Sequence, residues 1–362
     1  MIPLFTRFPK LQSHFPHLPL GTFPTPVESM TGLNGRCGRG ELYIKRDDLS
    51  GLLYGGNKVR KLEFLLAEAK RAGAKRVITS GAAGSNHALA TALYSRQCGF
   101  KTTLMLFEQP PLPGIGATLL ADLATGAEMF HDATYQQHLD HLQSVAAACR
   151  DDDGMPPYII PAGGSCPVGI IGFVNAAFEL GEQITKGRLP EPVAIYVAFG
   201  TMGTAAGLLL GLRAAGIRSK LIAVRVVPES VANRVKFTSL FNETNNLLLS
   251  GDPSFPRCTI DDNDFAICDD YLGEGYGKTT PDALSAIEEF ASAEGITLDP
   301  VYTGKTGAAF LAEARRKKYN GRPLLYWHTK NSRSLPSGED DFHQLPADFH
   351  RYFTFAATIS RE

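Results

Sequence analysis

Short β-branched runs alternate with longer amphipathic segments along most of the chain. Apolar residues recur at helical spacing from Val59 to Ala69, and Gly73 follows as a stop signal, which predicts a helix over this stretch. The runs KRVITS, KTTLMLF, PYIIPAGG, VAIYVAFG, KLIAVRVV and PLLYWHT predict buried strands. The segments HALATALYSRQCG, GIIGFVNAAFELGEQI, TAAGLLLGLRAAG, DALSAIEEFASAEG and KTGAAFLAEARRKK predict helices. Such alternation is typical of parallel sheets covered by helices, so we expect an α/β protein.

Two stretches depart from this pattern. The segment FNETNNLLLSGDPSFPRCTIDD, residues 241–262, is polar and interrupted by proline and glycine, so we expect it to be irregular. The polar, proline-punctuated stretch from Asn331 to Phe355 is expected to form a surface extension without catalytic residues.

Composition narrows the possible partners. The chain has 362 residues, enough for two domains, and its 36 basic and 37 acidic residues nearly balance. This balance argues against nucleic acid or a membrane surface as the partner and favours a small molecule. The N-terminal stretch is broken by prolines and no apolar run is long enough to span a bilayer, so we expect a cytoplasmic protein. The six cysteines form no CxxC pair, which favours free thiols over disulfides or a metal site.

Three loops are candidates for the functional site, because the loops after parallel strands converge at one edge of a sheet. They are GAAGSNH (residues 81–87), FGTMGTAAG (199–207) and DPVYTGKTG (299–307). In the second loop, glycines and two threonines precede a helix, so backbone N–H groups and hydroxyls can converge on one phosphate. The loop fits neither the Walker nor the GxGxxG pattern, which favours a single phosphate over a dinucleotide. An ordinary tight turn is the alternative.

The segment YGGNKVRKLE concentrates cations where a helix is predicted to begin. Lys58, Arg60 and Lys61 fall in the first turn, where the unpaired N–H groups already favour an anion. Gly55 and Gly56 permit close approach of a ligand. The alternative for Lys58 is an ordinary surface lysine that contacts only water, as most lysines do. A phosphate-bearing aldehyde would satisfy the segment, with one lysine forming a Schiff base and another facing the phosphate.

Five motifs in order carry a family resemblance: IKRDDLSGLLYGGNKVRKLEFLLAEAK, SNH, GTMGTAAGL, GYG and LDPVYTGK. From about Phe5 to Thr329, the chain resembles the pyridoxal-phosphate enzymes grouped as D-cysteine desulfhydrase and 1-aminocyclopropane-1-carboxylate deaminase. The resemblance implies the tryptophan synthase β-like fold (fold type II), with two open parallel-sheet domains, pyridoxal 5'-phosphate in the cleft between them, and a homodimer. We accordingly expect a large cofactor-binding domain from residues 1–60 and 170–362 and a small domain from residues 61–169.

The resemblance also implies roles for individual residues. Lys58 corresponds to the lysine that forms the Schiff base and then serves as base, and Lys61 to one that helps to neutralise the phosphate. Burial and neighbouring cations are expected to lower the pKa of Lys58, as both tasks require. Ser85 is implied at the substrate carboxylate or in proton transfer, Asn86 at the phenolic oxygen of the cofactor and His87 beside the ring. The remaining implied residues contact the phosphate, line the substrate side or face the pyridine nitrogen: Gly200, Thr201, Met202, Gly203 and Thr204; Tyr276 and Tyr302; and Thr303.

Two positions help to select a branch of this family. The deaminases usually have glutamine where this chain has His87, and glutamate where it has Thr303. A threonine hydroxyl allows a neutral pyridine, which suits β-elimination to pyruvate and ammonia, so desulfhydrase-like chemistry is favoured. The alternatives are a deaminase, an L-cysteate sulfo-lyase and a non-catalytic cofactor-binding protein. A nicotinamide enzyme is disfavoured because no GxGxxG is present.

The segment His328 to Asn331, HTKN, departs from the HTGG that is usual in the family. Lys330 and Asn331 replace two glycines that normally let the chain pass close to the cofactor. Phe199 and Met202 also enlarge the phosphate loop. We therefore expect a reshaped substrate pocket.

Overall fold

The computed structural model describes residues 2–38, 41–316, 321–335 and 341–353, which form two compact units. The larger unit comprises residues 1–64 and 165–332, and the smaller comprises residues 65–164 and 333–362. The chain therefore divides within helix α4 (Lys58–Arg71) and at residue 165, where we expected boundaries at residues 60 and 170. The stretch after residue 332 groups with the smaller unit, which differs from the expected assignment to the larger domain.

The larger unit is built on a six-stranded sheet in the order β1-β2-β10-β7-β8-β9. All neighbouring pairs are parallel except β1 with β2. The strands are β1 (Val27–Ser29), β2 (Leu42–Lys45), β7 (Ala194–Phe199), β8 (Lys220–Arg225), β9 (Phe265–Cys268) and β10 (Leu324–Trp327). The helices are α1 (Pro3–Arg7), α2 (Leu11–His14), α3 (Thr31–Cys37), the start of α4, α8 (Pro167–Thr185), α9 (Gly203–Ala214), α10 (Arg234–Gly251), α11 (Pro281–Glu294) and α12 (Thr303–Arg315).

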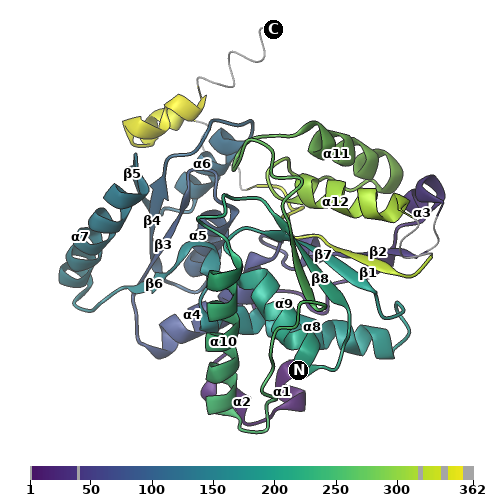
Figure 1. Ribbon diagram of the computed structural model, residues 1–362. Helices are drawn as coiled ribbons and strands as arrows, with labels where there is room; N and C mark the ends of the chain where they lie inside the picture. Colours follow the sequence, from purple (N-terminus) through teal and green to yellow (C-terminus); the bar gives the residue numbers. More distant parts are fainter. Residues whose placement is uncertain (1, 39–40, 317–320, 336–340, 354–362) are drawn as a thin grey trace, which may run out of the picture. The chain divides into compact units, whose positions relative to one another are not determined.

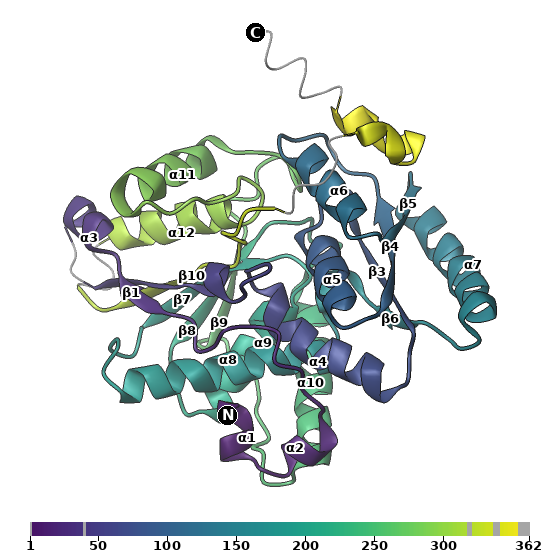
Figure 2. The ribbon, with the colours of Figure 1, turned by 180° about the vertical axis from the view of Figure 1, so that it is seen from behind.

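Helices cover both faces of this sheet, and side-chain alternation along the strands explains why. Ile195 and Val197 of β7 belong to the core cluster formed with α8, α9 and α10, whereas Ala194 and Tyr196 belong to the cluster formed with α11 and α12. Successive residues of a strand point to opposite faces, so a strand buried on both sides must be apolar throughout. Both views show α8 and α9 along one face and α11 and α12 along the other (Figures 1 and 2).

The smaller unit contains a four-stranded parallel sheet in the order β5-β4-β3-β6. Its strands are β3 (Arg76–Ala82), β4 (Lys101–Phe107), β5 (Glu128–Asp132) and β6 (Tyr158–Ile160), and its helices are α5 (Asn86–Gln97), α6 (Ile115–Ala124) and α7 (Tyr135–Asp153). Leu104 and Leu106 pack in the cluster with α5 and α6, whereas Met105 packs with residues of α7. The predicted α/β class with two parallel-sheet units is therefore correct.

The prediction of an irregular segment over residues 241–262 was correct for residues 252–262, which form neither helix nor strand, and wrong for the residues before them. Residues 241–251 continue α10, which Asn233 caps by accepting a hydrogen bond from the Lys236 N–H at 3.0 Å. Phe237, Phe241 and Leu248 lie on one buried face of this helix, and its asparagines mask that apolar stripe in the sequence.

The C-terminal stretch was expected to be a surface extension, but its described part packs against the core of the smaller unit. Leu345, Phe349 and Tyr352 are buried there with residues of α6. Two short 3₁₀ turns, Phe342–Gln344 and Ala347–Phe349, place these side chains. Residues 336–340 and 354–355 of the predicted extension lie outside the described residues.

Among the described residues, no helix combines the length and the apolar character needed to cross a membrane.

Candidate functional site

Close backbone packing fixes the first turn of α4. A Cβ atom at Gly172 of α8 would lie 2.0 Å from the Arg60 carbonyl oxygen, so only glycine allows the two helices to approach this closely. The Asn57 N–H, just before the helix, donates to the Thr329 carbonyl at 3.1 Å. These contacts determine where the side chains of Lys58, Arg60 and Lys61 point.

Arg60, which the sequence grouped with Lys58 and Lys61 as cations that favour a nearby anion, finds its anions within the protein. Its guanidinium donates to both carboxylate oxygens of Asp47, at 2.9 and 2.7 Å, and to both of Glu179, at 3.0 and 2.9 Å. All three side chains are buried. Asp47 also accepts hydrogen bonds from Thr25 and from the Trp327 indole, which completes its coordination.

A second cation balances this buried network. Lys45 donates to Glu179 and to the Thr25 carbonyl. Burial alone would raise the pKa of the Glu179 carboxyl, but the Arg60 and Lys45 charges lower that pKa to about 2. Two cations and two carboxylates therefore neutralise one another in the interior, where an unpaired charge would be strongly unfavourable.

Lys58, two residues earlier, has a different environment. Its Nζ donates to the Asn57 side-chain oxygen at 2.8 Å, and burial lowers its pKa to about 8, although Asp299 acts in the opposite direction. A larger fraction of this amine is therefore neutral at physiological pH than for an ordinary lysine, which makes it a better nucleophile and base.

Lys61 lies beside a cluster of hydroxyl groups. Its Nζ is 3.2 Å from Ser165 Oγ, and Ser165 Oγ is 2.8 Å from Thr201 Oγ1 and accepts a hydrogen bond from the Gly203 N–H at 3.3 Å. Burial and then the neighbouring Lys58 lower the pKa of Lys61 well below its usual value. A bound anion would relieve this electrostatic penalty.

The first turn of α9 borders the same cluster. Met202, its N-cap residue, has φ 65° and makes no side-chain capping bond, and the first N–H group of α9, that of Gly203, donates instead to the Thr201 carbonyl at 2.8 Å and to Ser165 Oγ. Such a conformation is uncommon for a residue other than glycine and is found most often at functional sites. Thr204 accepts a hydrogen bond from the Asn57 side-chain amide at 3.0 Å, which ties this turn to α4.

We define the phosphate cup as Lys61, Ser165, Thr201, Gly203 and Thr204. A Cβ atom at Gly203 would lie 2.5 Å from Ser165 Oγ and 2.8 Å from Lys61 Nζ, so glycine lets both side chains approach the start of α9 closely. At Gly200 a Cβ atom would meet nothing nearer than 3.7 Å. Hydroxyls and the amine of Lys61, gathered at the start of a helix, are groups suited to bind a phosphate.

Tyr276 and Tyr302 form a pair. Their hydroxyl oxygens are 2.7 Å apart and their rings meet edge to face. Burial raises the pKa of both, so both remain neutral phenols. One hydroxyl donates to the other, which leaves the pair a single proton to donate to a ligand.

The DPVYTGK segment is organised by Asp299. Its carboxylate accepts hydrogen bonds from the N–H groups of Val301, Tyr302 and Thr303 at 3.0, 2.7 and 3.2 Å, and one from the Thr303 hydroxyl. In the next turn, Lys305 donates to the Leu272 and Gly275 carbonyls, at 2.7 and 3.0 Å. These bonds hold the glycine-rich loop that carries Tyr276.

Ser85, Asn86 and His87 lie in the smaller unit, at the start of α5. Ser85 caps that helix by accepting the Ala88 N–H at 3.2 Å. The Thr79 hydroxyl donates to the Ile160 carbonyl and lies 2.9 Å from His87 Nε2. Because the Thr79 proton is already used, Nε2 must be the protonated nitrogen and donate to Thr79.

In the HTKN segment, the Asn331 side chain makes a hydrogen bond within the protein. The Asn331 side-chain oxygen accepts the Gly55 N–H at 2.7 Å, and a Cβ atom at Gly56 would lie 2.7 Å from the Thr329 carbonyl oxygen. Asn331 therefore holds the glycine pair that leads into Lys58, an interaction that a glycine at this position could not make.

Sequence reasoning missed Ser165, Asp299 and the carboxylate partners of Arg60. A signal for Ser165 was present, because GGSCP places a hydroxyl directly before a proline-initiated helix, at the end of a strand region. The partners of Arg60 lie 13 and 119 residues away in the sequence, so no local pattern connects them.

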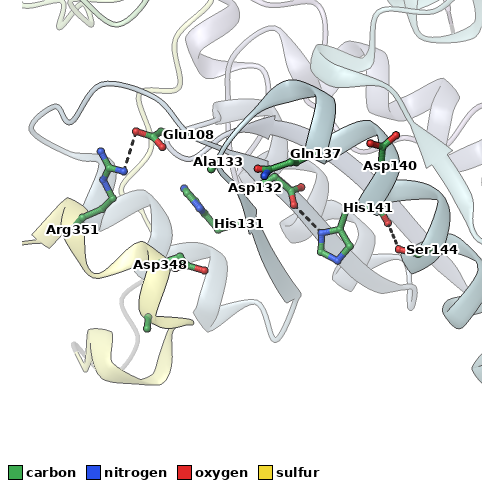
Figure 3. A pocket seen from close by; sticks show the side chains of 11 residues that line it. Glu108, His131, Asp132, Ala133, Gln137, Asp140, His141, Ser144, Asp348 and Arg351 are labelled. Carbon is green, nitrogen blue, oxygen red and sulfur yellow. Dashed lines mark hydrogen bonds and ion pairs between the residues drawn. The ribbon is translucent and has the colours of Figure 1, made fainter.

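A separate cavity of about 790 Å³ lies within the smaller unit, next to β5, α7 and the C-terminal turns (Figure 3). Carboxylates and imidazoles dominate its lining, with His141 bonded to Asp132 and Arg351 paired with Glu108. None of the predicted site residues lines it. In the part of the chain that the structure describes, no cluster of His, Cys, Asp and Glu is suited to a metal ion.

Comparison with known proteins places the chain in a broad enzyme class. Residues 18–329 match the family model described as "Pyridoxal-phosphate dependent enzyme". The chain is 37% identical over 334 residues to D-cysteine desulfhydrase of Klebsiella pneumoniae (strain 342), covering 89% of this chain and 96% of that protein. It is 35% identical over 332 residues to D-cysteine desulfhydrase of Salmonella choleraesuis (strain SC-B67), with the same coverage.

Solved structures agree with this assignment. A crystal structure of an ACC deaminase homologue matches with a TM-score of 0.77 and 33% identity, covering 91% of this chain and 95% of that one. Threonine deaminase isoform 2 from Solanum lycopersicum matches with a TM-score of 0.62 at 16% identity, over 94% of this chain and 86% of that one, which shows the shared fold. The chain thus belongs to the pyridoxal-phosphate dependent enzymes and has their type II fold.

Proposed function

We propose that the chain is a pyridoxal-phosphate dependent carbon–sulfur lyase that converts D-cysteine and water to pyruvate, ammonia and sulfide. One observation carries the proposal: a buried lysine with a lowered pKa, Lys58, stands one helical turn from a phosphate cup. The similarity to two D-cysteine desulfhydrases supports the choice of substrate.

The residues of the larger unit take complementary roles in this proposal. Lys58 would hold the cofactor at its aldehyde group, and its amine would serve as the base for the proton on the substrate α-carbon. Lys61 and the other members of the cup bind the phosphate. The bound cofactor supplies a conjugated pyridine that accepts electrons as a substrate bond breaks.

The tyrosine pair serves the leaving group. Because Tyr276 and Tyr302 are neutral and share one hydrogen bond, the free hydroxyl proton of the pair can be donated to a departing thiolate. Ser85, Asn86 and His87 are assigned to the substrate carboxylate, the phenolic oxygen of the cofactor and its ring. This assignment follows from the family resemblance.

Thr303 stands where the deaminases usually have a carboxylate, which distinguishes the chain from that branch in sequence. We further propose a homodimer, on the family resemblance, and a reducing compartment such as the cytoplasm. All six cysteines are free thiols, which supports the second point.

A substrate panel tests the proposal. Purified protein loaded with pyridoxal phosphate is incubated with D-cysteine, L-cysteine, L-cysteate or 1-aminocyclopropane-1-carboxylate, and pyruvate, sulfide, sulfite and 2-oxobutyrate are measured. We expect pyruvate and sulfide in equal amounts from D-cysteine, and loss of both in Lys58→Ala. Sulfite from L-cysteate or 2-oxobutyrate from the cyclopropane substrate would instead assign a sulfo-lyase or a deaminase. Cofactor binding without any keto acid would indicate a binding protein.

A further inference from the structure

The hydroxyl of Thr303 makes two short hydrogen bonds to a single residue, Asp299, and a longer contact of 3.5 Å with the carbonyl of the same residue. The Asp299 N–H donates to Thr303 Oγ1 at 2.7 Å, and Thr303 Oγ1 in turn donates to Asp299 Oδ2. Thr303 is 1% exposed, so solvent does not compete for these bonds.

The direction of these bonds follows from the available protons. A hydroxyl has one proton and two lone pairs, and an ionised carboxylate only accepts. Three backbone N–H groups also converge on the Asp299 carboxylate, as they would on an anion. The Thr303 proton is therefore committed to Asp299 and one lone pair to the Asp299 N–H. The remaining lone pair can accept a hydrogen bond, but Thr303 has no proton left to donate.

The negative charge of Asp299 remains available to a ligand. The donors to its carboxylate named above are neutral groups. Lys305, in the first turn of α12, donates to the Leu272 and Gly275 carbonyls, and burial lowers its pKa although Asp299 acts in the opposite direction. The charge also reaches the candidate site, because it raises the pKa of Lys58 against the larger lowering caused by burial.

We propose that Asp299 acts through Thr303 to hold a proton on the pyridine nitrogen of the bound cofactor. The inference rests on the proposed function, in which Thr303 faces that nitrogen. A neutral pyridine nitrogen only accepts hydrogen bonds and would meet a second acceptor, whereas a protonated one donates to Thr303 Oγ1. The positive ring is then balanced by a carboxylate one hydroxyl away. The sequence had suggested the opposite, that a threonine leaves the pyridine neutral.

Asp299 is a positioning residue, because it acts through Thr303. Together the two residues hold the proton on the pyridine nitrogen, which the deaminases are expected to do with a carboxylate. Protonation makes the ring a stronger electron acceptor. The ring bound by this chain can therefore accept electrons as strongly as the ring in the deaminases. Specificity between the branches must then come from other residues.

The test is the protonation state of the ring itself. The protein is loaded with pyridoxal phosphate labelled with ¹⁵N in the ring, and the ¹⁵N resonance is compared with those of the free cofactor at low and high pH. We expect the wild-type resonance at the position of the protonated ring near neutral pH. In Asp299→Asn, the side-chain oxygen can still accept the Val301 and Tyr302 N–H groups, but the amide donates to Thr303 and releases its hydroxyl proton. That resonance should move to the neutral position.

Thr303→Val and Thr303→Ser complete the set, because neither alters the Asp299 side chain. The valine variant should give a neutral ring, and the serine variant, which preserves the relay, a protonated one. A neutral ring in the wild type would overturn the inference while leaving the proposed function intact. A ring that stays protonated in Thr303→Val would also overturn it, because another group would then hold the proton. Failure of the wild type to bind the cofactor would overturn both.

Discussion

The first turn of α4 carries two kinds of buried cation with opposite environments. Arg60 is matched by two carboxylates through four hydrogen bonds within the protein. Lys58 and Lys61, on either side of it in the sequence, are bonded to an amide oxygen and a hydroxyl, and burial lowers the pKa of both. The comparison teaches that carboxylates inside the protein neutralise Arg60, whereas Lys58 and Lys61 lie beside neutral polar groups, where a ligand could supply the negative charge.

The largest expected effect on stability comes from removing Arg60, the cation that is paired with carboxylates. Arg60→Met leaves Asp47 and Glu179 buried without their main partner, and we expect the free energy of unfolding to fall by about 3–5 kcal/mol. Chemical denaturation measures this directly. Arg71→Met is the matched control, since that side chain is 53% exposed at the end of the same helix and should change stability by ~0.5 kcal/mol or less. A loss below about 1 kcal/mol for Arg60→Met would show that the network is not structural.

The pH dependence of cofactor binding tests the environment of Lys58. Only the neutral amine attacks an aldehyde, and burial lowers the Lys58 pKa to about 8, so the neutral fraction rises with pH through that value. At pH 7 that fraction should be roughly 300-fold above that of an ordinary lysine. The rate at which cofactor-free protein binds pyridoxal phosphate should therefore rise with a midpoint near pH 8. A midpoint above pH 10 would contradict the buried environment.

Lys61→Met probes the phosphate cup. Loss of a hydrogen bond to a charged group typically removes about 1.5–3 kcal/mol, so affinity for pyridoxal phosphate should fall roughly 10- to 150-fold. Affinity for pyridoxal, which has no phosphate, should hardly change. Lys70→Met, an exposed lysine on the same helix, is the control. Equal losses for the two ligands would place Lys61 outside the phosphate site.

Gly203→Ala and Gly200→Ala form a smaller, matched test in one loop. The added methyl at Gly203 would meet Ser165 Oγ at 2.5 Å, whereas at Gly200 its nearest neighbours lie at 3.7 Å. We expect Gly203→Ala to weaken phosphate binding by about 1–3 kcal/mol and Gly200→Ala to have little effect. Titration of the visible absorbance of the bound cofactor measures both. Similar effects of the two variants would mean that the cup does not close around the phosphate at Gly203.

The sequence predicted the elements that are apolar and regular, and it failed where partners are distant or where polar residues mask a pattern. Helix α4 and strands β3, β4, β7 and β8 follow directly from their periodicity. The helix at residues 241–251 was missed because asparagines obscure the stripe of Phe237, Phe241 and Leu248. Local charge density led us to group Arg60 with the two lysines as cations that favour a nearby anion, because nothing near it in sequence reveals Glu179, which α8 brings within hydrogen-bonding distance.

The candidate site was also predictable only in part, because local motifs are visible in the sequence and hydrogen-bond partners are not. Glycines and threonines before a helix indicate a phosphate-binding loop, and the first turn of α4 indicates the lysines. Hydrogen-bond direction is not written in a motif, so the commitment of the Thr303 proton to Asp299 became visible only in three dimensions.

Identification of the lysine that binds the cofactor tests the account most directly. Protein loaded with pyridoxal phosphate is reduced with borohydride, digested and mapped by mass spectrometry. The account predicts one modified residue per chain, Lys58, with no modification of Lys61 or Arg60. Modification of Lys61, or of any lysine outside the first turn of α4, would contradict it.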